Sequence, residues 1–412
     1  MKYIIILGDG MSDQPEIEHG GLTPLMAARI PNIDRLAELG RSGLLKTIPE
    51  RLHPGSEVAN LAVLGYDVEA VFEGRGVIEA ASIGVELEEG DLALRCNLIC
   101  IADEKIKNHS AGHISTAEAI ELIEALNENF GDEKVRFYPG VSYRHLLVIK
   151  GGNKSLKCVP PHDVTGTPVV DVLPCSSVES GEETAQLLLN LIHQSSELLE
   201  NHPVNVKRKM EGKDPANSIW PWSPGYKPSM KTLKEMFGIG SGAVISAVDL
   251  IQGIGVYAGL DVIKVEGATG LYDTNYEGKA IAAVEALKTR DFVYLHIEAS
   301  DEAGHEGNYD LKLKTIEYLD NRVVKYLVDE IAKMDEPVAI AILPDHPTPW
   351  KLKTHTRDAV PFLIWYPGIQ PDAVKQYDEI AAREGDYGTI ESQQFMQELL
   401  KSPFTIDSCH SE

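Results

Sequence analysis

Three aspartates and three histidines of this 412-residue chain follow apolar segments that read as buried strands, and together they could bind metal ions. They are Asp9, Asp301, His305, Asp345, His346 and His355. Carboxylates and imidazoles in this ratio suit borderline divalent ions such as Zn²⁺ or Mn²⁺. Six ligands are too many for one four-coordinate ion and suit two, and two ions roughly 4 Å apart form a clamp for phosphoryl transfer. The pattern therefore predicts a two-metal site.

The stretch HIEASDEAGHEG, residues 296–307, supplies two of these ligands. Asp301 and His305 stand four positions apart, which puts both side chains on one face of a helical turn. Taken alone, the stretch could be a solvated acidic turn, and the other candidates could be helix caps, turn residues or surface side chains. The coincidence of all six at the ends of three strands favours the metal site. The three glutamates of the stretch are not needed as ligands, and we expect them to support the site or face solvent: Glu298, Glu302 and Glu306.

A candidate nucleophile lies in HPGSEVANLAVLGYD, where Ser56 follows Pro-Gly and opens a helical apolar pattern. The N-terminus of a helix turns backbone N–H groups and the positive end of its dipole toward an attacking alkoxide and an incoming phosphate. Coordination to a metal would activate the hydroxyl further. On this segment alone, Ser56 could instead be an N-cap residue without chemistry.

Strand and helix patterns alternate along most of the chain. Continuous apolar runs such as YIIIL, DFVYLHI and VAIAIL are typical of parallel strands that helices cover on both faces. Helical patterns separate them, including IPNIDRLAELGRSG and the long LKLKTIEYLDNRVVKYLVDEIAKM. This order predicts an α/β fold with a mostly parallel sheet flanked by helices. In such a sheet, ligands bind at the carboxyl ends of the strands, where the metal-ligating candidates stand.

The middle of the chain has a different pattern. Between residues 86 and 179, short strand-like pieces flank one helix, STAEAIELIEALNENF, which predicts a smaller inserted α+β domain. The core domain would then span residues 1–85 and 180–412. Residues 201–230 are rich in proline and break the periodicity, so we expect a long connection there.

Composition excludes some classes of partner. Asp and Glu number 63 against 38 Lys and Arg, and the formal net charge of -25 argues against a nucleic-acid or anionic membrane surface. No apolar run approaches the roughly 20 residues of a membrane helix, and MKYIIILGDG reads as a first strand rather than a signal peptide. The five cysteines form no Cys-x-x-Cys pair, so we expect a reduced, cytoplasmic protein.

Local positive charge could still bind an anionic substrate. The residues concerned lie around or within the inserted segment: Arg75, Arg95, His113, Arg144, His162 and Asp163. The planar fork of arginine binds carboxylate and phosphate through two hydrogen bonds, as a phosphorylated acid would require. Taken singly, each could be an ordinary surface side chain. No Gly-x-x-x-x-Gly-Lys-Ser/Thr occurs, so a nucleotide-binding loop is poorly supported.

Several of these motifs resemble those of a known family. LGDG, PGSEVAN, DEAGHEG, PDHPTP and THTRDAVPF match, in order and context, the alkaline-phosphatase superfamily, and within it the cofactor-independent phosphoglycerate mutases of the archaeal type. GGLTPLMAARIPNIDRLAELGRSG, SAGHIST and DTNYEGKAIAAVEAL extend the resemblance over nearly the whole chain. The resemblance implies an alkaline-phosphatase-like core with an inserted lid domain.

The resemblance also implies roles for the candidate residues. Ser56 would accept the phosphate, and the ions would be Mn²⁺, Mg²⁺ or Zn²⁺, with no bisphosphoglycerate required. The ligands would divide into two sets: Asp9, Ser56, Asp345 and His346 for one ion, and Asp301, His305 and His355 for the other. The phosphate would move from 3-phosphoglycerate to the serine and return to the 2-oxygen of the retained glycerate. A lid whose arginines bind the substrate carboxylate would exclude water meanwhile.

The lid segment departs from the family pattern. NHSAGHIST has His109 and His113 where the mutases commonly place Asp or Arg residues, and PPHDVTGTP is shorter than their polar loop. Fewer positive charges would suit a less anionic substrate, so a homoserine kinase-like phosphotransferase is an alternative. A metal-dependent phosphatase is another, and a metal-binding protein without catalysis is a third, against which the intact set of Ser56 and six ligands argues. The oligomeric state is left open.

Overall fold

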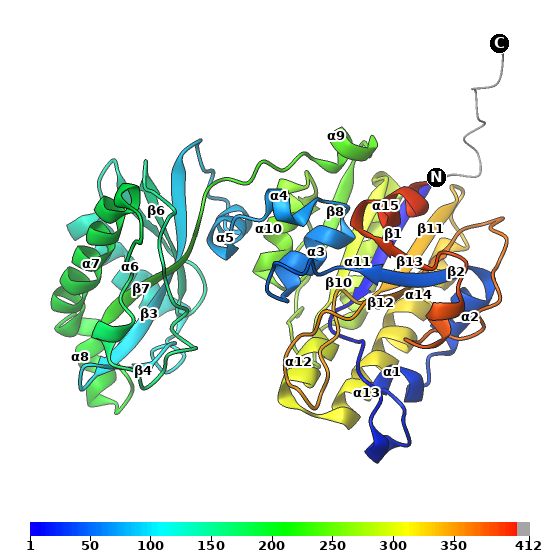
Figure 1. The fold of residues 1–412 in the computed structure, drawn as a ribbon, viewed down its shortest axis with the longest axis horizontal. Helices are drawn as coiled ribbons and strands as arrows, with labels where there is room; N and C mark the ends of the chain where they lie inside the picture. The colour runs from blue at the N-terminus through cyan, green and yellow to red at the C-terminus, as the bar shows by residue number, and fades with distance from the viewer. Residues whose placement is uncertain (402–412) are drawn as a thin grey trace, which may run out of the picture. The chain divides into compact units, whose positions relative to one another are not determined.

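The computed structural model describes residues 1–401, and the chain forms two compact units (Figure 1). The core unit comprises Met1–Phe72 and the chain from Met230 onward, and the inserted unit comprises Glu73–Ser229. Each unit has its own sheet and its own hydrophobic core. No helix among the described residues is both long enough and apolar enough to cross a membrane.

The sheet of the core unit has eight strands. They are β1 (Lys2–Gly8), β2 (Arg41–Lys46), β8 (Gly242–Ile245), β9 (Asp261–Val262), β10 (Phe292–Ile297), β11 (Val338–Leu343), β12 (Val360–Trp365) and β13 (Thr389–Glu391). Their order across the sheet is β13-β2-β12-β11-β1-β10-β8-β9. β12 runs antiparallel to both neighbours, and the other pairings are parallel. The predicted α/β fold with a mostly parallel sheet is confirmed.

Helices cover both faces of this sheet (Figure 1). One layer contains α2 (Pro31–Leu39), α11 (Tyr276–Thr289), the π-helical turn η3 (Leu319–Val324) and α14 (Lys325–Ile331), and the other contains α3 (Ser56–Val63), α10 (Asp249–Tyr257) and α15 (Ser392–Leu400). Because both faces are covered, every residue of β10 and β11 is buried. The remaining helical segments of the core unit are η1 (Ile17–His19), α1 (Pro24–Ala27), α4 (Val68–Val71), α9 (Leu233–Phe237), α12 (Ala299–Glu306), α13 (Tyr309–Tyr318) and η4 (Ala381–Glu384).

The long helix expected after DEAGHEG is built from α13, η3 and α14 in succession. Its π-helical turn carries Asp320, whose carboxylate accepts hydrogen bonds from the backbone N–H groups of Asn32 (3.0 Å) and Ile33 (2.8 Å). These N–H groups belong to the first turn of α2, which has no side-chain cap of its own. Asp320 therefore caps α2 from a neighbouring helix.

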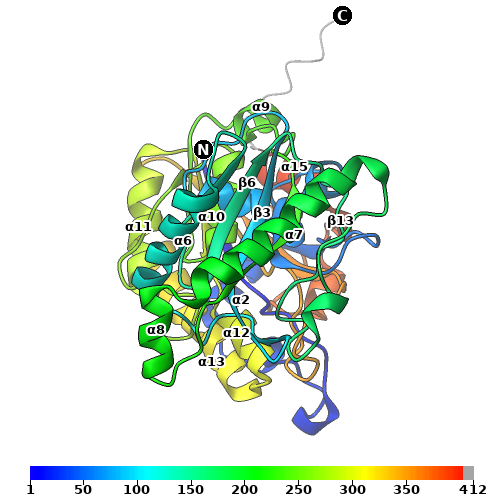
Figure 2. The same cartoon turned by 90° about the vertical axis from the view of Figure 1, so that its left-hand side faces the viewer.

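The inserted unit is a five-stranded sheet with helices on one face. The strands are β3 (Asp91–Ala102), β4 (Lys105–Asn108), β5 (Val135–Tyr138), β6 (Arg144–Lys150) and β7 (Ser218–Gly225). β4, β3, β6 and β5 are neighbours in that order, and β7 pairs with β3. Figure 2 shows α6 (Thr116–Phe130) and α7 (Glu179–Glu200) lying over β3 and β6. Their apolar residues form the core with Leu94, Leu147 and Ile149.

The inserted unit is larger than the predicted domain of residues 86–179. It also includes α5 (Arg75–Ser82), which packs on β3 and β7, and the stretch from α7 through α8 (Pro203–Met210) to β7. The predicted boundaries are corrected to 73 and 229, and the connection expected over 201–230 is instead a helix and a strand. Pro221 and Pro224 hid the strand in the sequence. β7 can contain them because it pairs with β3 alone among the described strands.

A buried ion pair joins the loop after β1 to α13. The ammonium group of Lys312 donates to Asp13 Oδ2 (2.7 Å), to the carbonyl of Ser12 (2.9 Å) and to the carbonyl of Thr348 (2.7 Å). Glu379 completes the network, because its two carboxylate oxygens accept hydrogen bonds from Asp13 N (2.9 Å) and Thr23 Oγ1 (2.8 Å). The network holds the loop after β1 against the loop after β11.

The pKa of Glu379 makes the stability of the core unit depend on pH. Burial raises this pKa from 4.5 to about 7. The folded state therefore keeps a proton that the unfolded chain has released, so this stabilising contribution is complete below pH 4.5 and is lost as the pH rises through about 7. We expect Glu379→Gln, which cannot ionise, to remove this dependence, which amounts to about 3 kcal/mol.

Urea unfolding of the wild type and of Glu379→Gln, at pH values from 4.5 to about 7, measures how the free energy of unfolding depends on Glu379. The difference between their free energies of unfolding should change steadily with pH, whereas the exposed Glu384→Gln should follow the wild type. Parallel curves for the wild type and Glu379→Gln would show that folding does not raise the pKa of Glu379.

Candidate active site

Three adjacent parallel strands bring the predicted aspartates together. β11, β1 and β10 are neighbours in the sheet, so their carboxyl ends lie at one edge. Asp345, Asp9 and Asp301 follow these strands, and each is at most 4% exposed. β2 also runs in this direction, and α3 begins after it at Ser56. The same sheet edge therefore receives the candidate ligands and the candidate nucleophile.

Asp9, Asp345 and His346 form the first group of ligand atoms, which lie within 4.8 Å of one another. Ser56 Oγ lies 3.1 Å from His346 Nε2, so the hydroxyl faces this group. The N-cap of α3 is Gly55, and Ser56 is the first residue of the helix. The alternative that Ser56 is only a capping residue is therefore wrong.

Hydrogen-bond donors hold the Asp345 carboxylate in place. Its Oδ1 accepts from the backbone N–H of His346 (2.9 Å) and of Gly10 (3.2 Å). Its Oδ2 accepts from the side-chain amide of Asn60 (2.8 Å), whose own oxygen accepts from the hydroxyl of Tyr294 (2.5 Å). Asn60 lies one turn after Ser56 on α3, so one helix positions both the nucleophile and a ligand.

Asp301, His305 and His355 form the second group. The distances are 3.2 Å from His305 Nε2 to Asp301 Oδ2, 3.4 Å from His355 Nε2 to Asp301 Oδ1, and 2.9 Å between the two Nε2 atoms. Burial opposes ionisation of Asp301, but the hydrogen bonds from His305 and His355 outweigh it and hold its pKa well below the usual range. The bond to Asp301 raises the pKa of His305 to about 9.

The two groups touch through His346. Its ring centroid is 3.9 Å from that of His355, and ligand atoms of Asp301, His346 and His355 also lie within 4.8 Å of one another. Burial, followed by the charge of Asp345, raises the pKa of Asp9 well above its usual value. Asp9 Oδ1 is buried and accepts no hydrogen bond from any described residue. A buried carboxylate oxygen without a donor, among imidazoles and further carboxylates, fits a divalent metal ion.

Sequence reasoning missed His296 at this site, whereas Glu298 was expected there only as a supporting or solvent-facing residue. His296 Nε2 lies 2.9 Å from Asp9 Oδ2, its Nδ1 lies 3.1 Å from Ser246 Oγ, and burial lowers its pKa to about 3. A neutral imidazole between a hydroxyl and a ligand carboxylate orients that carboxylate. The Glu298 side chain is 13% exposed and lies 3.6 Å from His296 Nε2. A histidine inside the apolar run FVYLHI was the available signal for His296.

Lys279 adds a buried positive charge beside this edge. Its ammonium group donates to the carbonyl of His296 at 3.2 Å, and burial lowers its pKa to about 8, although the charge of Glu298 opposes this shift. The lysine lies on α11, within the pattern YEGKAIAAVEALKT, where it looks like an ordinary polar residue of a helix. Only the packing of α11 on β10 brings it to the site.

The predicted substrate-binding residues all lie in the inserted unit. Contacts between rings and guanidinium groups link most of them through two aromatic residues. Around Trp222, Arg95 lies over the ring (4.6 Å) and His162 contacts it (5.5 Å). Around Tyr143, the contacts are with His109 (5.8 Å), His113 (6.2 Å) and Arg144 (5.8 Å), and His109 in turn contacts His162 (6.1 Å). Asp163 Oδ1 lies 3.6 Å from His162 Nε2. Burial lowers the pKa of Arg95, and the charges of Arg75 and Arg144 lower it further. The charge of Glu79 opposes this shift.

Arg95 is the least accessible of the predicted substrate-binding residues. It is 8% exposed, and its Nε lies 3.0 Å from Glu79 Oε2. Arg144 begins β6 and is exposed. The structure therefore gathers these residues on one face of the inserted sheet, with Arg95 at the base of the cluster.

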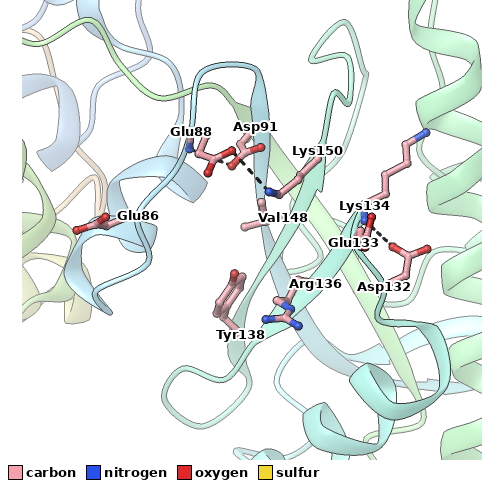
Figure 3. Close-up of a pocket in the computed structure, with 10 residues that line it drawn as sticks. All are labelled: Glu86, Glu88, Asp91, Asp132, Glu133, Lys134, Arg136, Tyr138, Val148 and Lys150. Carbon is pink, nitrogen blue, oxygen red and sulfur yellow. Dashed lines mark hydrogen bonds and ion pairs between the residues drawn. The ribbon is translucent and has the colours of Figure 1, made fainter.

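A separate groove of about 630 Å³ lies on the inserted unit (Figure 3). Its lining includes acidic and basic residues that pair with groups nearby. Lys150 lies 3.6 Å from Glu88, Lys134 lies 3.0 Å from Glu183, and Asp132 accepts from the N–H groups of the turn before β5. Several of its charges are paired, and it gathers no cluster of candidate metal ligands among the described residues, so it is a weaker candidate than the sheet edge of the core unit.

Comparison with known proteins identifies similar sequences and structures. Residues 37–205 match a family model described as 2,3-bisphosphoglycerate-independent phosphoglycerate mutase. The chain is 51% identical to a protein of that name from Methanosarcina acetivorans, over 97% of this chain and the full length of the relative. It is 49% identical to one from Methanothermobacter thermautotrophicus, over 97% of each.

Two solved structures are also similar over almost their whole length. The structure of the PH0037 protein from Pyrococcus horikoshii has a TM-score of 0.82 and 30% identity, with 98% of this chain and 99% of that chain covered. The cofactor-independent phosphoglycerate mutase from Thermoplasma acidophilum has a TM-score of 0.69 and 28% identity, with 97% and 99% covered.

Gly10 provides a test of how tightly the site is built. Its φ of +59° is strained for other residues, and an added Cβ would lie 2.5 Å from Thr348 Oγ1 and 2.6 Å from Asp301 Oδ1. We expect Gly10→Ala to lower the free energy of unfolding by about 1–3 kcal/mol and to weaken Mn²⁺ binding at least tenfold, because Asp301 must move.

Urea unfolding and calorimetric titration with Mn²⁺ measure these two effects. Gly20→Ala is the matched control, because Gly20 has a φ of +69° but no atom within 4 Å of an added Cβ. It should lose only the roughly 1 kcal/mol of backbone strain and bind Mn²⁺ normally. Equal behaviour of the two variants would contradict the close packing described for Gly10.

Proposed function

This chain belongs to the family of 2,3-bisphosphoglycerate-independent phosphoglycerate mutases, and we propose that it interconverts 3-phosphoglycerate and 2-phosphoglycerate through a phosphoserine at Ser56. The observation that carries the proposal is the position of Ser56 Oγ, 3.1 Å from His346 Nε2 and at the N-terminus of α3. The hydroxyl faces the first ligand group, and the helix terminus favours an anion at the same place.

We assign the metal ligands to two divalent ions, Mn²⁺, Mg²⁺ or Zn²⁺. One set would comprise Asp9, Ser56, Asp345 and His346, and the other Asp301, His305 and His355. When bound, the ions supply positive charge for the phosphoryl group and Lewis-acid activation of the serine hydroxyl. Asn60 and the N–H groups of Gly10 and His346 keep Asp345 in position for this role.

Ser56 performs both halves of the reaction. In the first, the Ser56 hydroxyl gives up its proton as its oxygen bonds to phosphorus, and the bond from phosphorus to the 3-oxygen breaks, which leaves that oxygen to take up a proton as a hydroxyl. In the second, the 2-hydroxyl of the same glycerate gives up its proton as it attacks the phosphoserine, and the Ser56 oxygen leaves phosphorus and regains a proton. The glycerate must stay bound and water must be excluded in between, because water would hydrolyse the phosphoserine.

We propose that the inserted unit is the lid that retains the glycerate. Arg75, Arg144, His113, His162 and Asp163 would contact the substrate. Arg95, which the sequence also suggested as a contact, is buried and paired with Glu79, so we propose that it supports the others. Their clustering on one face, linked through Trp222 and Tyr143, supports this assignment. Arginines there would bind the carboxylate, which is distant from the transferred phosphate.

We also propose a cytoplasmic location. The four described cysteines, Cys96, Cys100, Cys158 and Cys175, are free thiols, which is typical of a reducing compartment. Cys409 lies outside the described residues.

Mn²⁺-loaded protein supplied with 3-phosphoglycerate tests the proposed reaction. We expect 2-phosphoglycerate to form without added bisphosphoglycerate and without release of inorganic phosphate, as measured by coupling to enolase and by a phosphate assay. Consumption of ATP with homoserine, in protein inert toward 3-phosphoglycerate, would instead identify a homoserine kinase. Release of phosphate as the main product would identify a phosphatase.

Ser56→Ala tests the nucleophile. We expect mutase activity to fall at least about 10³-fold, because no other group can carry the phosphate. Mass spectrometry of wild-type protein quenched during turnover should find phosphate on the peptide containing Ser56, and Mn²⁺ should still bind to the variant through the remaining ligands. Ser196→Ala is the control, since that hydroxyl donates to the carbonyl of Ile192 in its own helix. Retained turnover in Ser56→Ala would refute the assignment.

A further inference from the structure

Thr348 touches both ligand groups. It follows His346 by two residues, in PDHPTP, and is completely buried. Its hydroxyl forms a short hydrogen bond with Asp301 Oδ1 and lies 3.2 Å from His346 Nδ1. Asp301 is the carboxylate of the second ligand group described above, and His346 belongs to the first group while its ligand atom also lies close to those of Asp301 and His355. One hydroxyl therefore connects the two groups.

The direction of these hydrogen bonds follows from the groups involved. A carboxylate can only accept, so the single hydroxyl hydrogen of Thr348 is donated to Asp301. The hydroxyl oxygen must then accept from His346, which places a hydrogen on Nδ1. The lone pair of this neutral ring is thereby left on Nε2, the atom that lies 3.1 Å from Ser56 Oγ and 3.4 Å from Asp345 Oδ2.

The position of Thr348 does not depend on the ligands that it orients. Its carbonyl accepts from Lys312 Nζ at 2.7 Å, and its N–H donates to the carbonyl of Ser12 at 3.2 Å. It also packs against Gly304 of α12 so closely that a Cβ at that glycine would lie 2.5 Å from the Thr348 carbonyl oxygen. The loop after β1, α12 and α13 thus fix this residue together.

We propose that Thr348 is a positioning residue that sets the ligand tautomer of His346 and the orientation of Asp301 with one hydroxyl group. Loss of the hydroxyl weakens metal binding by both groups, because each loses the restraint on one ligand. This inference rests on the proposed metal site. Second-shell partners of this kind typically change metal affinity 10–100-fold.

The test compares Thr348→Val, which has a similar shape without the hydroxyl, with Thr348→Ser, which keeps the hydroxyl. Calorimetric titration of the metal-free protein with Mn²⁺ should show 10–100-fold weaker binding for the valine variant and near-normal binding for the serine variant. With saturating Mn²⁺, the KM for 3-phosphoglycerate should stay within about threefold while kcat falls, because the substrate-binding residues are unchanged.

Nitrogen NMR of histidine-labelled protein gives a readout that is independent of activity. The wild type and Thr348→Ser should show His346 with its hydrogen on Nδ1, and Thr348→Val should show a mixture of tautomers. Thr315→Val is the matched control, because Thr315 is also buried but its hydroxyl donates to the carbonyl of Lys312, away from the ligands. It should bind Mn²⁺ like the wild type.

Three outcomes would overturn the proposal. Normal Mn²⁺ affinity and an unchanged tautomer in Thr348→Val would show that the hydroxyl does not position the ligands. Equal losses in Thr348→Val and Thr315→Val, with matching losses of stability in urea, would show a general effect of a buried hydroxyl. Absence of Mn²⁺ binding in the wild type would remove the metal site itself, and with it the metal-dependent mechanism proposed above.

Discussion

The candidate site depends on the close burial of carboxylates at one edge of a sheet. Asp9, Asp301 and Asp345 are almost inaccessible to solvent, and after burial it is the charge of Asp345 that most disfavours ionisation of Asp9. Like charges buried together are unfavourable unless donors or cations compensate them. The imidazoles of His305 and His355 offset the negative charge of Asp301, and three hydrogen-bond donors stabilise the carboxylate of Asp345. Divalent ions would supply the remaining positive charge.

The rest of the core unit can be understood as the support for this edge. The parallel order β11-β1-β10 places the three carboxylates side by side, and β10 and β11, which precede two of them, are buried along their whole length. α3 contributes Ser56 and Asn60 one turn apart. Lys312 joins the loops after β1 and β11 through a fully buried ammonium group, whose three hydrogen bonds satisfy all of its donors. Breaking such a network would leave Asp13 buried and unpaired, which typically costs about 3–5 kcal/mol.

Much of this site could be predicted because its ligands follow recognisable strands. Asp9 follows YIIIL, and Asp301 and His305 have helical spacing directly after FVYLHI. The supporting residues could not be predicted in the same way. Asn60, Lys312 and Thr348 look like ordinary polar residues of helices and loops. Asn60 bonds to Asp345, 285 residues away, and Lys312 bonds to Ser12, 300 residues away. The boundaries of the inserted unit failed for a related reason, since β7 contains prolines and its pairing with β3 joins segments more than 100 residues apart.

The sequence by itself determined the fold class, the identity of the six metal-ligating candidates and the position of Ser56 at the start of a helix. These properties depend on short stretches of sequence. Apolar periodicity defines the strands, and the residues that directly follow parallel strands lie at the same edge of the sheet. Only the tertiary structure decided which donors hold each carboxylate, that His346 contacts both ligand groups, and that His296, Lys279 and Thr348 adjoin the site. These relations depend on distances between segments remote in the chain, and such distances are set by packing of the whole core rather than by any local pattern.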